Sequence, residues 1–221
     1  MCSSDLLDDA FALSLVLEDR GVRPGERVAI IAGNSVDFAK VQWAITCCGA
    51  IPVPLSAQQS DDDLAAILED CGASLICLES QARGDRLMQH SSRPFANRPV
   101  LLFPELSELL EKGRGLLAVR GREALRTRLW DADPGALFLL MYTSGTTGEP
   151  KGAMISQTQF LGALHDCAEL FRTHLETEAE TSLTVLPLAN IFGQFELAIG
   201  RSEEHTSELH SPYVISYAVF C

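Results

Sequence analysis

Along the first third of the chain, segments with apolar residues at helical spacing alternate with short, mainly apolar runs. Apolar residues recur at helical spacing over residues 7–20, and this pattern stops at Gly21. Short apolar runs then alternate with segments that are typical of helices. The expected strands lie at residues 27–32, 50–55 and 74–78, and the expected helices between them at 34–49 and 60–72. Strand, helix and strand at this spacing predict an α/β fold, mainly a parallel sheet with helices on both faces.

Capping residues support these helix boundaries. Asn34 or Ser35 can cap the second helix, and Ser60 can cap the third, because their side chains accept hydrogen bonds from free backbone N–H groups. Gly49 follows the second helix, where a left-handed conformation is common. The two prolines within residues 50–55 predict either an edge strand or an exit strand, since proline cannot donate to a ladder.

The pattern is weaker between residues 81 and 128, which are rich in Arg, Pro and Gly. It predicts a short strand at 100–103 and short helices at 105–112 and 123–129. Beyond this region the pattern becomes clear again. The expected elements are a buried strand at 136–141, an extended segment at 153–155, an amphipathic helix at 157–171 and a strand at 182–186.

Composition narrows the class of protein. Apolar residues make up 47% of the 221 residues, which is enough for a sizeable core. The formal charge of −13 argues against nucleic-acid binding, which needs basic patches. None of the seven cysteines forms a C-x-x-C pair and no histidine cluster has metal-ligand spacing, so no metal site is predicted. We expect reduced cysteines in a cytoplasmic protein with no membrane span.

The two ends of the chain share an unusual property. Residues 201–206 can be encoded by one strand of a short oligonucleotide whose complementary strand translates to residues 1–6. This oligonucleotide resembles a common sequencing adapter, and residues 215–221 resemble the translation of its far end. We therefore expect residues 1–6 and 201–221 to derive from an adapter, and residues 7–200 to be the natural protein segment.

The stretch richest in candidate ligand-binding residues is Tyr142–Gly152, YTSGTTGEPKG, which follows the buried strand. Glycine lacks a Cβ atom, so the backbone N–H groups around it can approach an anion closely. Hydroxyl groups add short donors, and a lysine adds a mobile charge. Together these groups predict a loop that wraps a polyphosphate. The candidate residues are Thr143, Ser144, Gly145, Thr146, Thr147, Gly148 and Lys151.

This loop differs from the common nucleoside-triphosphatase loop, which has the pattern G-x-x-x-x-G-K-[ST] and opens a helix. Here Pro150 precedes the lysine, Gly152 follows it, and the next residues are extended. The alternative is a Gly/Ser/Thr-rich surface turn. The order of residues in Tyr142–Gly152 and the position of this stretch directly after a buried strand favour the phosphate-binding interpretation.

YTSGTTGEPKG resembles the signature phosphate-binding loop of the adenylate-forming, or AMP-binding, superfamily, which includes acyl- and aryl-CoA synthetases, adenylation domains of peptide synthetases, and luciferases. The stretch that begins GVRPGERVAI, at Gly21, is similar to the family's opening region. The segment Pro187–Gly193, PLANIFG, resembles its second core motif, where a helix lines the pocket of the carboxylate substrate. The resemblance implies that residues 7–200 form part of an N-terminal AMP-binding domain.

The resemblance also implies a reaction in two steps. A carboxylate attacks the α-phosphorus of ATP to give an acyl-adenylate and pyrophosphate, and a thiol then takes the acyl group. The implied ligands are ATP, Mg²⁺, coenzyme A and a small carboxylic acid, either a fatty or an aryl acid. A carrier protein is the alternative acceptor of the acyl group. In these terms residues 143–148 cradle the β- and γ-phosphates, Lys151 neutralises charge, and Asn190, Phe192 and Gly193 lie beside the acyl pocket.

Two positions depart from the family pattern. The family commonly has histidine where this chain has Asn190, and often where it has Gln157. Asparagine forms hydrogen bonds but does not titrate near neutral pH. The alternatives to a coenzyme A ligase are an adenylation domain that loads a carrier protein and a non-catalytic nucleotide-binding relative. Since the family's later motifs lie beyond Gly200, we expect this chain alone to be inactive.

Overall fold

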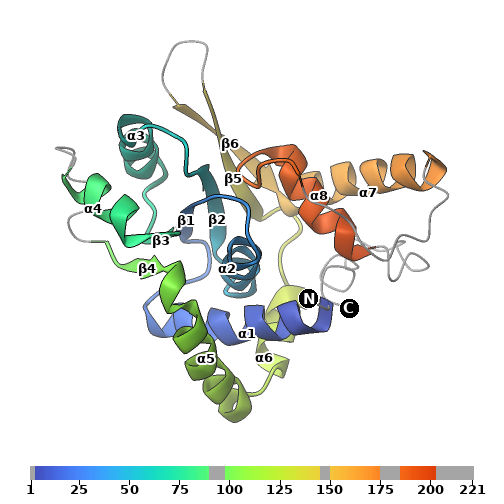
Figure 1. Cartoon of the computed structure of the whole chain (residues 1–221). Helices are drawn as coiled ribbons and strands as arrows, with labels where there is room; N and C mark the ends of the chain where they lie inside the picture. The colour runs from blue at the N-terminus through green and yellow to red at the C-terminus, as the bar shows by residue number, and fades with distance from the viewer. Residues whose placement is uncertain (1–2, 90–97, 145–149, 175–184, 203–221) are drawn as a thin grey trace.

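The computed structural model describes residues 3–89, 98–144, 150–174 and 185–202. Figure 1 shows the order of the elements along the chain. The helices are α1 Ser3–Asp19, α2 Val36–Cys47, α3 Asp61–Cys71, α4 Gln81–Gln89, the 3₁₀ helix η2 Phe103–Glu105, α5 Leu106–Arg120, α6 Glu123–Trp130, α7 Gln157–His174 and α8 Ile191–Ser202. The strands are β1 Arg27–Ala32, β2 Ile51–Ser56, β3 Leu75–Leu78, β4 Val100–Leu102, β5 Leu137–Ser144 and β6 Pro150–Ser156.

A parallel four-stranded sheet in the order β2-β1-β3-β4 forms the centre of the fold. Successive residues of β1 point to opposite faces, so Val28 and Ile30 pack with α1, α2 and α5, whereas Ala29 and Ile31 pack with α3 and α4. Figure 1 shows these two helical layers on either side of the sheet. The predicted α/β fold with helices on both faces of a parallel sheet is confirmed.

The predicted caps are present where local sequence determines them. The Ser35 hydroxyl accepts a hydrogen bond from the Phe38 N–H at 3.0 Å, and Ser35 is the N-cap of α2. Ser60 caps α3 in the same way, accepting from the Asp63 N–H at 3.1 Å. Gly49 has φ +72°, as expected of a left-handed residue after a helix.

The edge position of β2 is also confirmed, and it explains the two prolines of that strand. The Ile51 N–H donates to the Glu26 carbonyl, so the N–H groups of alternate β2 residues face β1. Pro52 and Pro54 occupy the positions between, at the side away from β1. β5 packs against β2, but the hydrogen bonds of β5 go to β6 in a separate antiparallel sheet.

Helices α4 and α5 differ from the prediction. α4 was not expected; its Leu87 is fully buried in the core cluster beneath α3. α5 continues past the predicted end at residue 112 as far as Arg120, because Leu117 packs into a second core cluster with α1, α2 and α6. Gly113 lies within this helix where it meets the backbone of α1.

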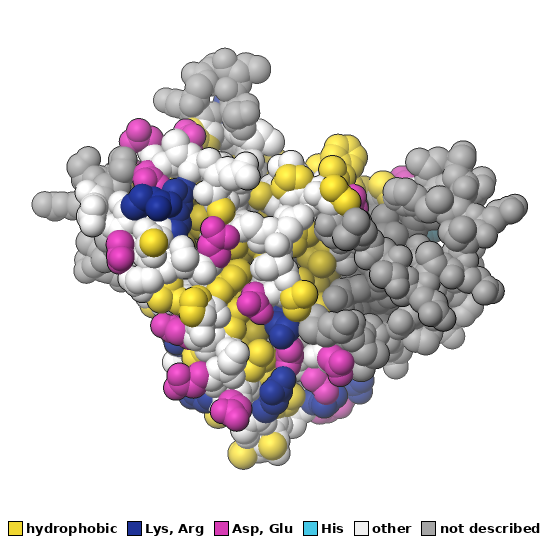
Figure 2. Space-filling model, viewed as in Figure 1, with side chains coloured by type: hydrophobic (Ala, Val, Ile, Leu, Met, Phe, Trp, Pro, Cys, Tyr) yellow, Lys and Arg dark blue, Asp and Glu magenta, His cyan; other side chains and the backbone are white. Residues whose placement is uncertain are grey.

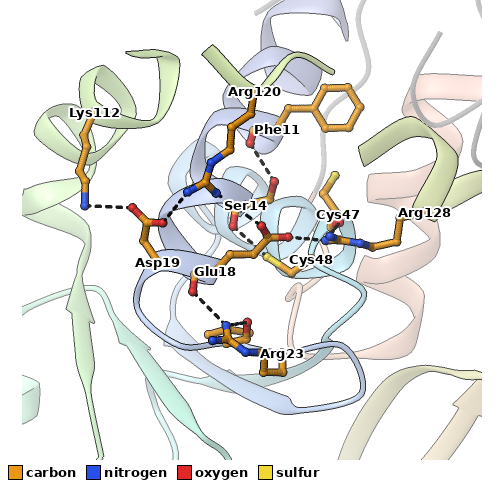
Figure 3. A network of polar contacts seen from close by, with 11 residues as sticks. Phe11, Ser14, Glu18, Asp19, Arg23, Cys47, Cys48, Lys112, Arg120 and Arg128 are labelled. Carbon is orange, nitrogen blue, oxygen red and sulfur yellow. Dashed lines mark hydrogen bonds and ion pairs between the residues drawn. The ribbon is translucent and has the colours of Figure 1, made fainter. Parts of the chain in front are cut away.

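A network of polar contacts joins α5 and α6 to α1 and α2 (Figure 3). Asp19 pairs with Arg120 at 3.1 Å and with Lys112 at 3.6 Å. Glu18 pairs with Arg128, which also donates to the Cys47 carbonyl at 3.3 Å. Figure 2 shows acidic and basic side chains intermingled over the part of the surface where these helices lie.

After α6 the chain forms the β5–β6 hairpin, then α7 and α8. The buried strand, the extended segment and the amphipathic helix predicted here are confirmed, with Phe138 stacked on Phe160 at 4.8 Å between ring centroids. The strand predicted at 182–186 is wrong for Val185 and Leu186, and residues 182–184 lie outside the described ranges. The Glu196 carboxylate accepts from the N–H groups of Val185 and Leu186, both at 3.1 Å, in place of a neighbouring strand.

Candidate functional site

A pocket of about 470 Å³ opens at the carboxyl end of β2. Ligands of open α/β folds commonly bind at this end of the strands. Segments that lie far apart in the sequence meet here: β2 with the start of α3, the end of β5 with the start of β6, and the turn before α8. The lining residues are Pro54, Ser56, Gln59, Asp63, Ile67, Tyr142, Thr143, Pro150, Ala189 and Asn190.

The predicted phosphate loop is attached to one wall of this pocket. Thr143 and Ser144 end β5, and Lys151 lies opposite Thr143 in β6. Opposite residues of an antiparallel pair project from the same face, so Thr143 and Lys151 lie side by side at the base of the loop. Both are exposed, and Thr143 lines the pocket. Gly145, Thr146, Thr147 and Gly148 lie outside the described residues.

Tyr142 fixes the hairpin to α3. Its hydroxyl donates to Asp70 Oδ2 at 2.5 Å, and burial together with this carboxylate raises the pKa of Tyr142 well above its usual range. Opposite Tyr142 in the ladder, a Cβ atom on Gly152 would lie 3.0 Å from Tyr142 Cζ, so the glycine leaves room for the ring. The sequence motif gave Tyr142 no role; the contact depends on a helix seventy positions earlier, which no local pattern reveals.

The wall formed by α3 was also missed by the sequence analysis. The Ser56 N–H donates to Gln59 Oε1 at 3.0 Å, which closes the turn between β2 and α3. Arg83 holds the same turn from α4: its guanidinium donates to the Gln59 carbonyl at 2.5 Å and pairs with Asp61 at 2.8 Å. The one signal for this wall in the sequence is its place directly after a predicted strand.

The turn before α8 supplies the opposite wall. Asn190 lines the pocket, and its N–H donates to the Pro187 carbonyl at 2.8 Å. Phe192 is 65% exposed, lies outside the pocket lining and stacks edge-on with Phe195. Gly193 is buried, and a Cβ there would lie 2.2 Å from the Pro187 carbonyl oxygen. Thr143 and Asn190 are therefore brought together in one pocket, whereas Gly193 acts through the close approach of its backbone.

The chemistry of the described residues limits what they can hold. Within residues 3–89, 98–144, 150–174 and 185–202, no group of three His, Cys, Asp or Glu side chains is arranged to bind a metal ion. Among the described residues that line the pocket, Asp63 is the one carboxylate, so these residues do not form a magnesium site by themselves. None of the described helices is both long and apolar enough to span a bilayer.

The chain is similar to known proteins in sequence and in fold. Residues 4–203 match the family model described as AMP-binding enzyme. The long-chain-fatty-acid–CoA ligase FadD15 of Mycobacterium bovis is 28% identical over 187 residues, which are 83% of this chain and 30% of that protein. The anthranilate–CoA ligase of Pseudomonas aeruginosa is 32% identical over 163 residues, 73% of this chain and 29% of that protein. The chain thus spans less than a third of the length of these relatives.

A solved structure has a similar fold. The structure of VinN in complex with 3-methylaspartate superimposes with a TM-score of 0.71 and 26% sequence identity. The superposition covers 88% of this chain and 50% of the VinN chain.

Proposed function

The chain belongs to the family of AMP-binding enzymes, and from this premise we propose that it is part of an ATP-dependent ligase that activates a carboxylic acid. A carboxylate oxygen attacks the α-phosphorus of ATP. The bond between this phosphorus and the oxygen that bridges it to the β-phosphate breaks, and pyrophosphate leaves. The acyl-adenylate then passes its acyl group to the thiol of coenzyme A and releases AMP.

The observation that carries this proposal is the meeting of Thr143 and Asn190 at one pocket. In the proposal, the loop from Thr143 to Gly148 cradles the β- and γ-phosphates, and Lys151 stabilises the charge that develops on pyrophosphate. Fixed donors and a cation aimed at a leaving group lower the barrier without reorganisation during the reaction. The loop is joined to the pocket at Thr143, so the phosphates and the acid would lie in adjoining spaces.

A fatty or aryl acid is the substrate class that we propose. Pro54, Ile67 and Ala189 give the pocket apolar surfaces, while Asn190 offers an amide that can bind a carboxylate or carbonyl oxygen. The names of the two relatives, one a long-chain-fatty-acid ligase and one an anthranilate ligase, support the same two classes.

The deciding experiment begins with the gene. Sequencing the source DNA across the junctions 6/7 and 200/201 gives the full reading frame, and its product is assayed for exchange of labelled pyrophosphate into ATP with fatty and aryl acids. Acid-dependent exchange supports the proposal, and we expect none from the 221-residue chain alone. ATP binding without exchange for any acid would instead favour a non-catalytic relative, in which Asn190 replaces a titrating residue. Acyl transfer to a carrier protein but not to coenzyme A would favour the carrier-loading alternative.

A further inference from the structure

The turn that presents Asn190 to the pocket is held from a distant part of the chain. Asn34, which lies between β1 and α2, donates through Nδ2 to the Leu186 carbonyl at 2.8 Å. Its Oδ1 accepts from the Leu188 N–H, also at 2.8 Å. A single side-chain amide thus binds the backbone on both sides of Pro187, as a neighbouring strand would. This use of its side chain is separate from helix capping, which Ser35 performs.

A pair of glutamine side chains also binds the same turn. Gln42 of α2 and Gln194 of α8 form a reciprocal pair, in which each side chain donates to the oxygen of the other. Their exposed fractions are 2% and 1%. Gln194 Nε2 also donates to the Leu188 carbonyl. Both backbone groups of Leu188 are therefore bound by side-chain amides, the N–H by Asn34 and the carbonyl by Gln194.

These contacts determine the place of the pocket residues. Leu188 is buried against the cluster of α1, α2 and α5, and Ala189 and Asn190 follow it directly into the pocket lining. The Asn190 N–H binds the Pro187 carbonyl, and the Asn190 carbonyl accepts from the Gln194 N–H at 3.1 Å. A shift of Leu188 would therefore move Asn190 relative to Thr143 across the pocket.

We propose that Asn34 and the Gln42–Gln194 pair are positioning residues of the acid pocket, which hold the turn of residues 186–190 so that Ala189 and Asn190 face Thr143. The proposal rests on the proposed function, since it assigns the acid to this pocket. Buried amides are costly without partners, yet two apolar side chains of similar size can replace a buried polar pair at little cost. The pair is therefore explained better by the backbone group that it holds than by stability alone.

Kinetics of the full-length protein separate positioning from stability. Asn34→Ala and the double variant Q42L/Q194L are assayed by pyrophosphate exchange against Gln81→Ala, an exposed amide on α4 that bonds Asp85 away from the pocket. We expect KM for the acid to rise about tenfold in both test variants, the factor that corresponds to 1.4 kcal/mol, and KM for ATP to change less than about twofold. The double variant also removes the donor to the Leu188 carbonyl, so its Tm should fall, and the two KM values are compared at a temperature where every variant stays folded. Equal increases in both KM values, or an unchanged KM for the acid, would overturn the proposal.

A second measurement keeps the proposal independent of the proposed function. Hydrogen exchange of the 221-residue chain, followed by NMR, reports the Leu188 and Asn190 amides directly. Asn34→Ala should speed exchange of both by about tenfold or more, while the Ile30 amide within the sheet keeps its rate. If exchange at Leu188 is unchanged, Asn34 does not hold the turn. Suppose that the wild-type enzyme activates no acid while Asn34→Ala still speeds exchange of these two amides. In that case the proposed function fails, but the inference that Asn34 holds the turn of residues 186–190 stands.

Discussion

Gly113 of α5 and Ala12 of α1 bring their two helices into backbone contact. A Cβ atom on Gly113 would lie 2.3 Å from the Ala12 carbonyl oxygen, far inside any permitted contact. Neither side of this contact is a flexible side chain, so a larger residue could be accommodated only if one helix moved. The contact fixes the spacing of the two helices that cover one face of the sheet.

Replacing Gly113 with alanine should destabilise the fold by about 1–3 kcal/mol, since the helices must separate and lose packing. Gly115 lies on the same helix, and a Cβ there meets nothing within 4 Å. Gly115→Ala should therefore stabilise the fold by roughly 0.5–1 kcal/mol, because it removes the entropy of a helical glycine. Urea unfolding of both variants measures the difference. Equal effects at the two positions would contradict the close contact.

Asp9 should contribute far more to stability than its neighbour Asp8. The Asp9 side chain is 8% exposed and pairs with Lys40, itself 16% exposed, at 2.9 Å and with Arg114 at 2.7 Å. Asp9→Ala leaves the Lys40 ammonium largely buried without this partner, and we expect a loss of about 2–4 kcal/mol. Asp8 pairs with Arg122 at the surface, so Asp8→Ala should cost less than about 1 kcal/mol. The free energy of unfolding at neutral pH, measured in urea, distinguishes the two.

Buried thiols should make the fold sensitive to alkali. Burial raises the pKa values of Cys47, Cys48 and Cys77 well above their ordinary value of 9.0. The unfolded chain releases these protons from about pH 9 upward while the folded chain retains them, so the thiols stabilise the fold fully below pH 9. Above it, each thiol should lower the free energy of unfolding by about 1.4 kcal/mol per pH unit. Denaturant unfolding at several pH values tests this slope, and Cys77→Val should reduce it.

Lys151 should affect ATP binding and leave stability unchanged. It is exposed, and among the described residues it has no ion-pair partner within 4.0 Å. Lys151→Ala in the full-length protein should raise KM for ATP by about tenfold or more, in line with the loss of one contact to a charged group. Lys112→Ala, on α5 far from the pocket, serves as the control. Equal ATP kinetics in the two variants would remove Lys151 from the phosphate site.

The elements that sequence could predict are those fixed by neighbours in the chain. Ser35 and Ser60 bond to N–H groups three residues later, and the alternation of β1 determines which side chains face each helical layer. Contacts between distant segments could not be read in this way. The length of α5 depends on its fit against α1, and α4 depends on Leu87 reaching a core assembled from other elements.

The same distinction applies to the site. The motifs indicated Thr143 and Asn190, and both line the pocket. The wall from α3 and the amide contacts of Asn34 and Gln42 were not predicted, because asparagine and glutamine have no sequence signature for binding a turn 152 residues away. The positions of the loop residues 145–148 lie outside the described residues, so their role stays a prediction.

The prolines of β2 have a consequence for the β5–β6 hairpin. Pro52 and Pro54 leave the outer edge of the parallel sheet without two backbone donors, and β5 packs beside this edge without joining its ladder. Within the described parts of β2 and β5 no backbone hydrogen bond joins the two strands, so a shift of the hairpin along the sheet edge breaks no ladder hydrogen bond there. Side-chain contacts such as Tyr142 to Asp70 set the position instead, so a single substitution at the seam can move Thr143 relative to the pocket without disrupting either sheet.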